Sequence, residues 1–167
     1  MITEEDIPVL LSVGKDNVYI WEKGETRLHE NEAAEILREM CQGEYMHPTP
    51  VKEGKIELVA DIDGLLKVDS DKMKKINGMG ELMIASRHGN FAVKKGDKLA
   101  GTRIIPLVIE REKMEQAKAV CEGEPILELK PFVHKKVGIV TTGNEVYYHR
   151  IEDTFTPVIK EKLAEYD

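Results

Sequence analysis

Hydrophobic positions along residues 1–130 occur in short runs of strand length, separated by turn residues. Pro8–Val13 and Asn17–Trp21 lie on either side of Gly14-Lys15-Asp16, and this pattern predicts a hairpin. We expect Trp21 to be a packing residue at a strand end.

A second hairpin is predicted where Ile56–Ile62 and Leu65–Val68 flank Asp63-Gly64. Asp-Gly between apolar runs favours a tight two-residue turn, because glycine readily adopts a positive φ. Further extended segments are predicted at Glu81–Ser86, Phe91–Val93, Lys98–Ile109 and Ile126–Leu129. Pro106 indicates a bend or an edge strand within the third of these.

Three helices are predicted from apolar residues at helical spacing. The first contains Ala33, Ile36, Leu37, Met40 and Cys41, with acidic residues in its first turn and Gly43 at its end. The second begins near Ser70, capped by Asp69 or Ser70, and ends near Gly78-Met79-Gly80. The third spans about Arg111–Cys121, buries Met114, Ala117, Val120 and Cys121, and stops at Gly123.

The pattern changes at about residue 131. Lys136–Val140 reads KVGIV and predicts a buried parallel strand. A helix is predicted next, with Thr156 as its N-cap and Pro157 at its first position. We therefore expect a strand-rich α+β domain over residues 1–130 and the first β-α unit of an α/β domain over residues 131–167.

A parallel strand needs neighbouring strands, and helices must cover both faces of its sheet. Residues 131–167 supply only one strand, one loop and one helix, so the sequence predicts that this domain is incomplete. The alternative is that the segment packs on the first domain or exchanges with another chain.

The composition is that of a soluble globular protein, with 41% hydrophobic and 33% charged residues among 167. The net charge of -7 argues against nucleic acid and anionic membranes as partners. The opening MITEEDIPVLL lacks the basic start of a secretory signal. Cys41 and Cys121 lie in helical apolar patterns and are expected to be buried thiols, which favours a reducing, cytoplasmic location.

The segment Val137–Val146, VGIVTTGNEV, holds the most informative polar residues. A loop beyond the carboxyl end of a parallel strand is where α/β folds bind ligands. Gly143 allows close approach of the backbone, while the side chains of Thr142, Asn144 and Glu145 offer hydrogen-bonding groups. These residues are candidates for binding a polar heterocycle or a metal-bound phosphate. The alternative is a capped turn without a ligand.

The stretch VGIVTTGNEVYYHRIEDTFTPVIKEKLAEY resembles the opening strand, loop and helix of the molybdopterin-binding domain of molybdopterin adenylyltransferases and molybdotransferases. Thr142, Gly143, Asn144 and Glu145 match the family's Ser/Thr-Thr-Gly-Asp/Asn-Glu motif. Asp153 stands where the family tends to have Asp before a Ser/Asn-rich turn, which Thr154-Phe155-Thr156 replaces here. Asn144 stands where many members have Asp, so one potential negative charge is missing.

The earlier stretches KIELVADIDGLLKVD, ELMIASRHGN and VKKGDKLAGTRIIPLVI are similar to the extra N-terminal part of one molybdopterin-binding subgroup, as is LHENEAA at Leu28–Ala34. The resemblance therefore covers nearly the whole chain. It implies a role in molybdenum cofactor biosynthesis, by molybdenum insertion or molybdopterin nucleotide transfer. The ligand would be molybdopterin or its adenylylated form, with magnesium and molybdate as further candidates.

The family's later loops, of Gly-Gly-x-Ser/Thr and Gly-x-x-Asp type, have no counterpart in these 167 residues. We therefore expect no competent transferase from the chain alone, and whether it belongs to an enzyme stays open. The alternative is a non-catalytic module that binds a small anion or assembles with a partner, either a second copy or a molybdoenzyme.

Other polar residues are weaker candidates for contact with a phosphate. They are Arg87, His88, Arg103, His149 and Arg150. Arg87 and His88 are better explained as a solvated turn, and Asp61 and Asp63 as turn residues. His29, His47 and His134 show no metal-ligand spacing.

Overall fold

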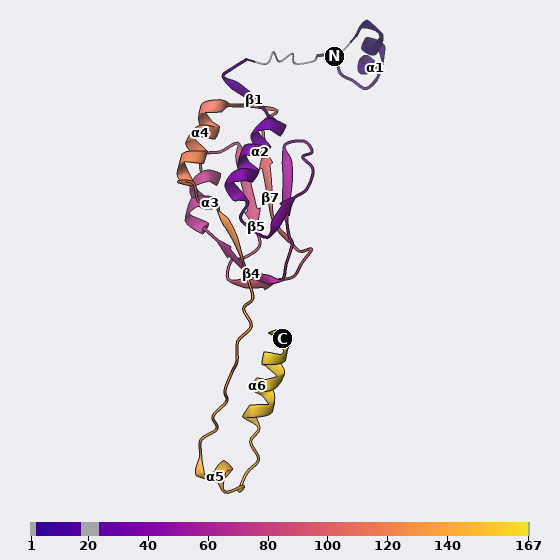
Figure 1. Cartoon of the computed structure of the whole chain (residues 1–167). Helices are drawn as coiled ribbons and strands as arrows, with labels where there is room; N and C mark the ends of the chain where they lie inside the picture. The colour runs from indigo at the N-terminus through magenta and orange to yellow at the C-terminus, as the bar shows by residue number, and fades with distance from the viewer. Residues whose placement is uncertain (1–2, 18–23, 167) are drawn as a thin grey trace.

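The computed structural model describes residues 3–17 and 24–166, which include a body (residues 24–131) and a C-terminal arm (residues 132–166) (Figure 1). The body contains β1 (Arg27–His29), α2 (Glu30–Cys41), β2 (Met46–Pro48), β3 (Lys55–Ala60), β4 (Gly64–Val68), α3 (Ser70–Asn77), β5 (Leu82–Ser86), β6 (Phe91–Val93), β7 (Lys98–Ile104), β8 (Val108–Glu110), α4 (Arg111–Val120) and β9 (Leu127–Pro131). The arm contains α5 (Asn144–Tyr147), α6 (Phe155–Leu163) and a 3-10 turn, η2 (Ala164–Tyr166). A 3-10 turn, η1 (Glu4–Asp6), and α1 (Ile7–Ser12) precede the body.

The body is a mixed α/β structure built on antiparallel sheets. A four-stranded sheet has the order β2-β3-β7-β5, a three-stranded sheet has the order β6-β4-β9, and β1 pairs with β8. Every one of these pairings is antiparallel. The strand-rich α+β expectation for this part of the chain agrees with this coarse architecture.

The predicted strands on either side of Asp63-Gly64 are present, but they do not pair with each other. β3 pairs with β2 and β7, whereas β4 belongs to the other sheet and pairs with β6 and β9. The predicted hairpin is therefore wrong. The Asp61–Asp63 segment carries the chain from one sheet to the next, and Asp63 accepts a hydrogen bond from the Lys95 amide at 2.7 Å. Asp63 therefore contacts a turn distant in sequence, rather than closing the hairpin turn that the sequence predicted.

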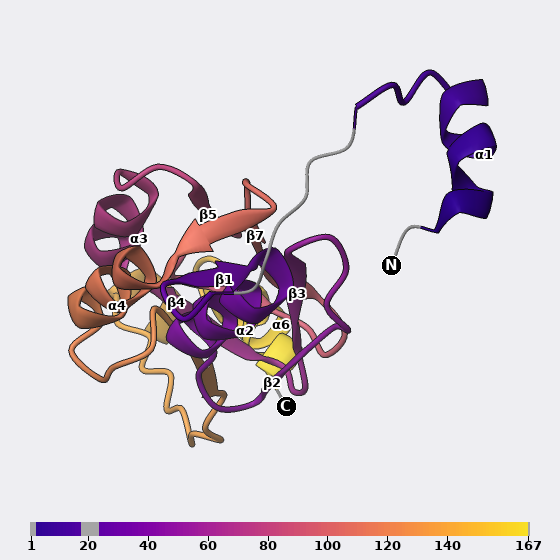
Figure 2. The ribbon, with the colours of Figure 1, turned by 90° about the horizontal axis from the view of Figure 1, so that it is seen from above.

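Helix α2 packs against β3 and β7 of the four-stranded sheet (Figures 1 and 2). Its buried residues are all apolar and include four of the five predicted ones, whereas Ile36 is only partly buried and Ala34 is an addition; they are Ala33, Ala34, Leu37, Met40 and Cys41. Burying a side chain the size of Leu37 stabilises the fold by roughly 1.5–3 kcal/mol. This helix and the inner face of the sheet form the centre of one continuous core.

The other two predicted helices of the body are confirmed. In α3, the Asp69 carboxylate accepts a hydrogen bond from the Lys72 amide at 3.0 Å, which caps the helix as expected. In α4, Met114 and Ala117 are buried. Gly123 follows this helix with a φ of 82°, a left-handed conformation that suits glycine. Cys41 and Cys121 are both buried free thiols, as predicted.

The N-terminal segment corrects the first predicted hairpin. Residues Ile7–Ser12 form α1 rather than a strand, with Pro8 near its start, where the missing amide proton costs no helical hydrogen bond. No residue of α1 is buried. Trp21 and most of the second predicted strand lie outside the described residues.

The predicted buried strand at Lys136–Val140 is also wrong. The arm runs without regular structure from Phe132 to Thr142, and Val140 is 86% exposed. Within the described residues no strand pairs with this segment, so the backbone ladder that defines a strand is missing. Helix α6 begins at Phe155 with Thr154 at the N-cap, two residues earlier than Pro157 predicted.

None of the helices in residues 3–17 and 24–166 combines the length and the apolar character needed to cross a bilayer.

Candidate functional site

The candidate site is the TTGNE loop, Thr141–Glu145, at the tip of the arm (Figure 1). Gly143 lies at a φ of 135° and a ψ of 128° and immediately precedes α5. A Cβ atom at this position would lie 2.6 Å from Oε1 of Glu145. The Glu145 carboxylate is the end of a flexible side chain and could move aside, so it is the backbone conformation that favours glycine here.

The side chains of Thr142, Asn144 and Glu145 are exposed. Within the described residues none of the three makes a side-chain hydrogen bond or an ion pair, so their polar atoms are free to meet a ligand. The structure thus brings the four predicted residues together on one short turn. They lie around the backbone bend at Gly143.

A polar cluster formed by Thr141, Asp153 and Thr156 ties this loop to the start of α6. The Thr141 hydroxyl lies 3.0 Å from Oδ2 of Asp153 and 3.1 Å from the Thr156 hydroxyl. Asp153 also accepts hydrogen bonds from the amides of Phe155 and Thr156, at 2.9 and 3.1 Å. The Asp153 carboxylate therefore holds the start of α6 next to Thr141, which lies 12 positions earlier in the sequence.

These donors lower the pKa of Asp153 from its usual 3.8 to about 2, and the Thr156 hydroxyl makes the largest contribution. Asp153 is therefore ionised at neutral pH. Sequence reasoning noted Asp153 only through the family motif and missed its contact with Thr141. The signal available was an Asp three residues before a Thr at a helix start, which is a capping pattern.

The residues that follow the loop turn partly back on it. The amide of Arg150 donates to the Glu145 carbonyl at 2.8 Å, and His149 has a φ of 53°. The Arg150 guanidinium lies 5.5 Å from the centre of the Tyr148 ring, so the aromatic ring holds this cation. The structure gives Arg150 an aromatic partner, which the sequence did not predict.

The predicted polar turn of the body is held by hydrogen bonds and a ring contact at its exposed surface. Arg87 donates to the Lys98 carbonyl at 2.8 Å and to Asp97 at 3.0 Å. His88 lies 2.7 Å from the Gly89 carbonyl and stacks edge-on against Phe91. The preference for a turn role at Arg87 and His88 is consistent with these contacts.

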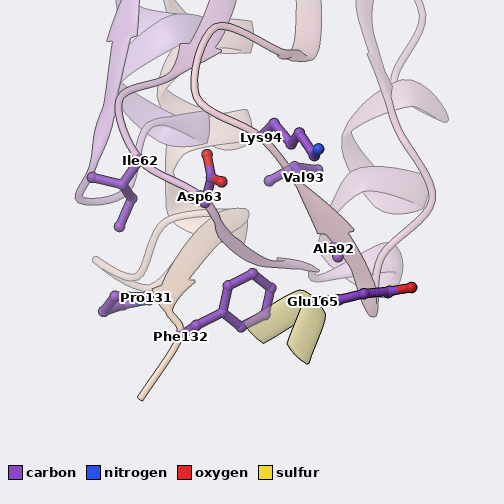
Figure 3. A pocket seen from close by; sticks show the side chains of 8 residues that line it. All are labelled: Ile62, Asp63, Ala92, Val93, Lys94, Pro131, Phe132 and Glu165. Carbon is purple, nitrogen blue, oxygen red and sulfur yellow. The ribbon is translucent and has the colours of Figure 1, made fainter. Parts of the chain in front are cut away.

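A hollow of about 660 Å³ lies where the arm joins the body (Figure 3). Asp63, Val93 and Lys94 line it from the body, Phe132 lines it at the base of the arm, and Glu165 reaches it from η2. The arm therefore leaves the body at Phe132 and returns to it near its end. The TTGNE loop lies at the opposite tip and contributes nothing to this hollow (Figure 1).

Across residues 3–17 and 24–166, no three or more His, Cys, Asp or Glu side chains are grouped to hold a metal ion. Glu145 is the one carboxylate of the TTGNE loop. Magnesium is commonly bound by one or two carboxylates together with substrate phosphates, so a metal at this loop would need oxygen atoms from its ligand.

Comparisons with protein-family models, with curated proteins and with solved structures found no match for this chain.

Proposed function

We propose that this chain is part of a molybdopterin-binding protein of molybdenum cofactor biosynthesis, and that residues 142–145 are its share of the cofactor site. The observation that carries the proposal is the geometry at Gly143. There the backbone bends in a conformation suited to glycine. Next to this bend lie three exposed polar side chains that have no side-chain partner among the described residues.

The chemistry of this donor set suits the proposed ligand. A pterin is a flat heterocycle with hydrogen-bond donors and acceptors along its edges, and molybdopterin also carries a phosphate. The Thr142 hydroxyl and the Asn144 amide can both donate and accept, while Glu145 accepts only. These residues would bind and orient the ligand. In the full protein the bound ligand would undergo molybdenum insertion or nucleotide transfer, with magnesium and molybdate as candidate participants.

Asp153 supports the site as a positioning residue. Its hydrogen bonds to Thr141 and to the start of α6 fix one end of the TTGNE loop. A loop held in place before binding loses less conformational freedom when the ligand arrives, and this favours affinity.

The test is to express the 167-residue chain in a host that makes molybdopterin, purify it, and measure the pterin fluorescence released per mole of protein. We expect the wild-type chain to retain pterin and Glu145→Ala to lower the content about tenfold, because a hydrogen bond to a charged group contributes roughly 1.5–3 kcal/mol.

Glu152→Ala is the matched control, since Glu152 is another exposed carboxylate of the arm. It should leave the pterin content unchanged. Equal retention by wild type and Glu145→Ala would remove Glu145 from the site. Absence of pterin from the wild-type chain would count against the whole proposal.

A second candidate function is assembly with a partner protein, and the arm's apolar surface favours it. Val140 and Phe155 are 86% and 78% exposed, and Val137 and Val158 are 57% and 50% exposed. Large exposed apolar surfaces commonly mark protein contacts. Sedimentation velocity over a wide concentration range tests self-assembly: a mass that rises with concentration supports it, and a strict monomer opposes it.

A further inference from the structure

The outer face of the four-stranded sheet contains a hollow of about 450 Å³ rich in cationic side chains, in the body and outside the TTGNE loop. We call it the cationic hollow and define it by its lining residues: Thr49, Pro50, Lys52, Glu53, Lys55, Glu57, Lys98 and Arg103. Four of these eight are Lys or Arg and two are Glu. The chain as a whole carries a net charge of -7, so this local excess of positive charge runs against the overall balance.

Strand alternation places these side chains on one face. In β3, Ile56 and Leu58 are fully buried against the core, so Lys55 and Glu57 point outward. Lys55 is paired directly with Arg103 of the neighbouring strand β7. The two cations therefore stand side by side on the outer face of adjacent strands.

A glycine leaves the outer face of the sheet open beside Glu57. Gly101 of β7 is the strand partner of Glu57 and has no atoms within 4 Å of the place where a Cβ would stand. The outer face is consequently open at this point, although β7 is a central strand of its sheet.

The charges in the hollow divide into a paired set and an unpaired set. Glu57 accepts from Lys55 at 2.9 Å and from Lys98 at 2.7 Å. These contacts, Lys98 first, lower the pKa of Glu57 to about 2, so it is ionised at neutral pH. Lys52, Arg103 and Glu53, in contrast, make no ion pair with any of the described residues, so cations outnumber the carboxylate in this unpaired set.

We propose that the cationic hollow binds a phosphate-like tetrahedral oxyanion, held chiefly by Lys52 and Arg103. Arginine presents a planar fork of donors that matches two oxygens of such an anion, and lysine adds a mobile point charge. Lys55 and Lys98 border the site, and their ion pairs with Glu57 neutralise the charge of this carboxylate. Free phosphate and the phosphate group of a small metabolite share this chemistry.

The proposal is tested by titrating the 15N-labelled chain with inorganic phosphate at constant ionic strength, following backbone amide shifts by NMR. Wild type should show saturable shifts at β3, β7 and the Lys52 turn, with a Kd on the order of 1 mM. Removing both unpaired cations in Lys52→Gln/Arg103→Gln should weaken binding at least about tenfold, since charge-assisted hydrogen bonds are the strong ones.

Lys94→Gln/Lys95→Gln is the matched control, because it removes the same charge from another exposed turn of the body. It should change the Kd less than about twofold, as screening weakens distant charges. If both double variants weaken phosphate binding equally, the effect would come from net charge alone and the proposed site would be wrong. Amide shifts that fail to saturate in the wild-type chain would also contradict the site. A glucose phosphate that binds more tightly than free phosphate would identify a metabolite as the ligand, and the reverse order would identify the free anion.

Glu57→Gln gives a result of opposite sign. Removing this carboxylate frees Lys55 and Lys98 and takes away a negative charge, so phosphate binding should tighten several-fold. A residue important only for folding would not produce tighter binding. Weaker binding in Glu57→Gln, with an unchanged melting temperature, would contradict the proposed arrangement.

Discussion

The body and the arm come from the same chain and contain similar apolar residues, yet they bury them very differently. In the body, Leu37, Ile56 and Leu66 have no exposed surface. In the arm, Val137, Val140 and Phe155 are all more than half exposed. The difference shows that an apolar pattern predicts a core only when neighbouring elements are present to cover it.

Core truncation should give the largest effect in this comparison. Leu37→Ala in α2 removes a fully buried side chain and is expected to lower the free energy of unfolding by about 3 kcal/mol, through lost burial and the cavity left behind. Val140→Ala in the arm should change it by less than about 0.5 kcal/mol. Urea unfolding followed by circular dichroism measures both. A comparable loss in Val140→Ala would mean that the arm is packed in solution.

Adding a methyl group to glycine should give the next largest effect. A Cβ at Gly43 would overlap the backbone carbonyl oxygen of Leu127, and backbone cannot move aside cheaply. Gly43→Ala is therefore expected to destabilise the body by about 2 kcal/mol. Gly138 in the arm has nothing within 4 Å of the same position, so Gly138→Ala is the control and should be close to neutral. The midpoints of thermal unfolding compare the two, and equal midpoints would contradict the packing described at Gly43.

Helix capping in the body should give a smaller effect. Asp69→Ala removes the acceptor for the Lys72 amide and is expected to cost about 1 kcal/mol of stability. Asp69→Asn keeps an acceptor and should cost clearly less. If chemical denaturation shows the same loss for both variants, the charge of Asp69 rather than its cap would be responsible.

The corresponding carboxylate of the arm should produce a local effect only. Asp153→Asn weakens the hydrogen bonds from Thr156 and Phe155, so amide exchange at these two residues should accelerate several-fold while exchange in the body stays unchanged. Hydrogen exchange followed by NMR resolves the two regions. Faster exchange in the body as well would show that the arm stabilises it.

The same carboxylate sets a pH dependence for the arm. The folded pKa of Asp153, about 2, lies below the ordinary 3.8, so its contribution is fully present above pH 4 and is lost as the pH falls through about 2. The amide shifts of Phe155 and Thr156 should therefore be constant from pH 7 to about pH 4 and titrate near pH 2. A midpoint near 3.8 would mean that the hydrogen bonds are not formed in solution.

Local sequence patterns were sufficient to predict an element whose own residues carry the apolar spacing and the cap that define it. The apolar spacing and flanking residues of α2, α3 and α4 predicted these helices close to their observed bounds. Cap and turn chemistry was equally readable, as Asp69 shows. Each of these features depends on residues within a few positions of one another.

The errors concern contacts that are distant in sequence. Asp63-Gly64 looks like a hairpin, but β3 and β4 pair with other strands, and two of their partners, β7 and β9, lie far along the chain. Six residues such as Ile7–Ser12 are too few to separate a strand from a short helix by periodicity. The run at Lys136–Val140 has strand composition, yet no described strand pairs with it.

For the candidate site, the sequence identified the glycine and the polar residues of the TTGNE loop but not its support. Thr141 and Asp153 meet across the segment that separates them, and no local pattern encodes that contact. The cationic hollow was foreshadowed only by Arg103, because its other members come together through the pairing of β3 with β7.

Hydrogen exchange of the whole chain, with and without molybdopterin released from a molybdoenzyme, tests the central claim most directly. Binding at residues 142–145 should slow exchange at the amides from Gly143 to Tyr147 and leave the core strands of the body unchanged. Unchanged exchange in the arm at saturating molybdopterin, or protection confined to the body, would contradict the assignment of this loop as the cofactor site.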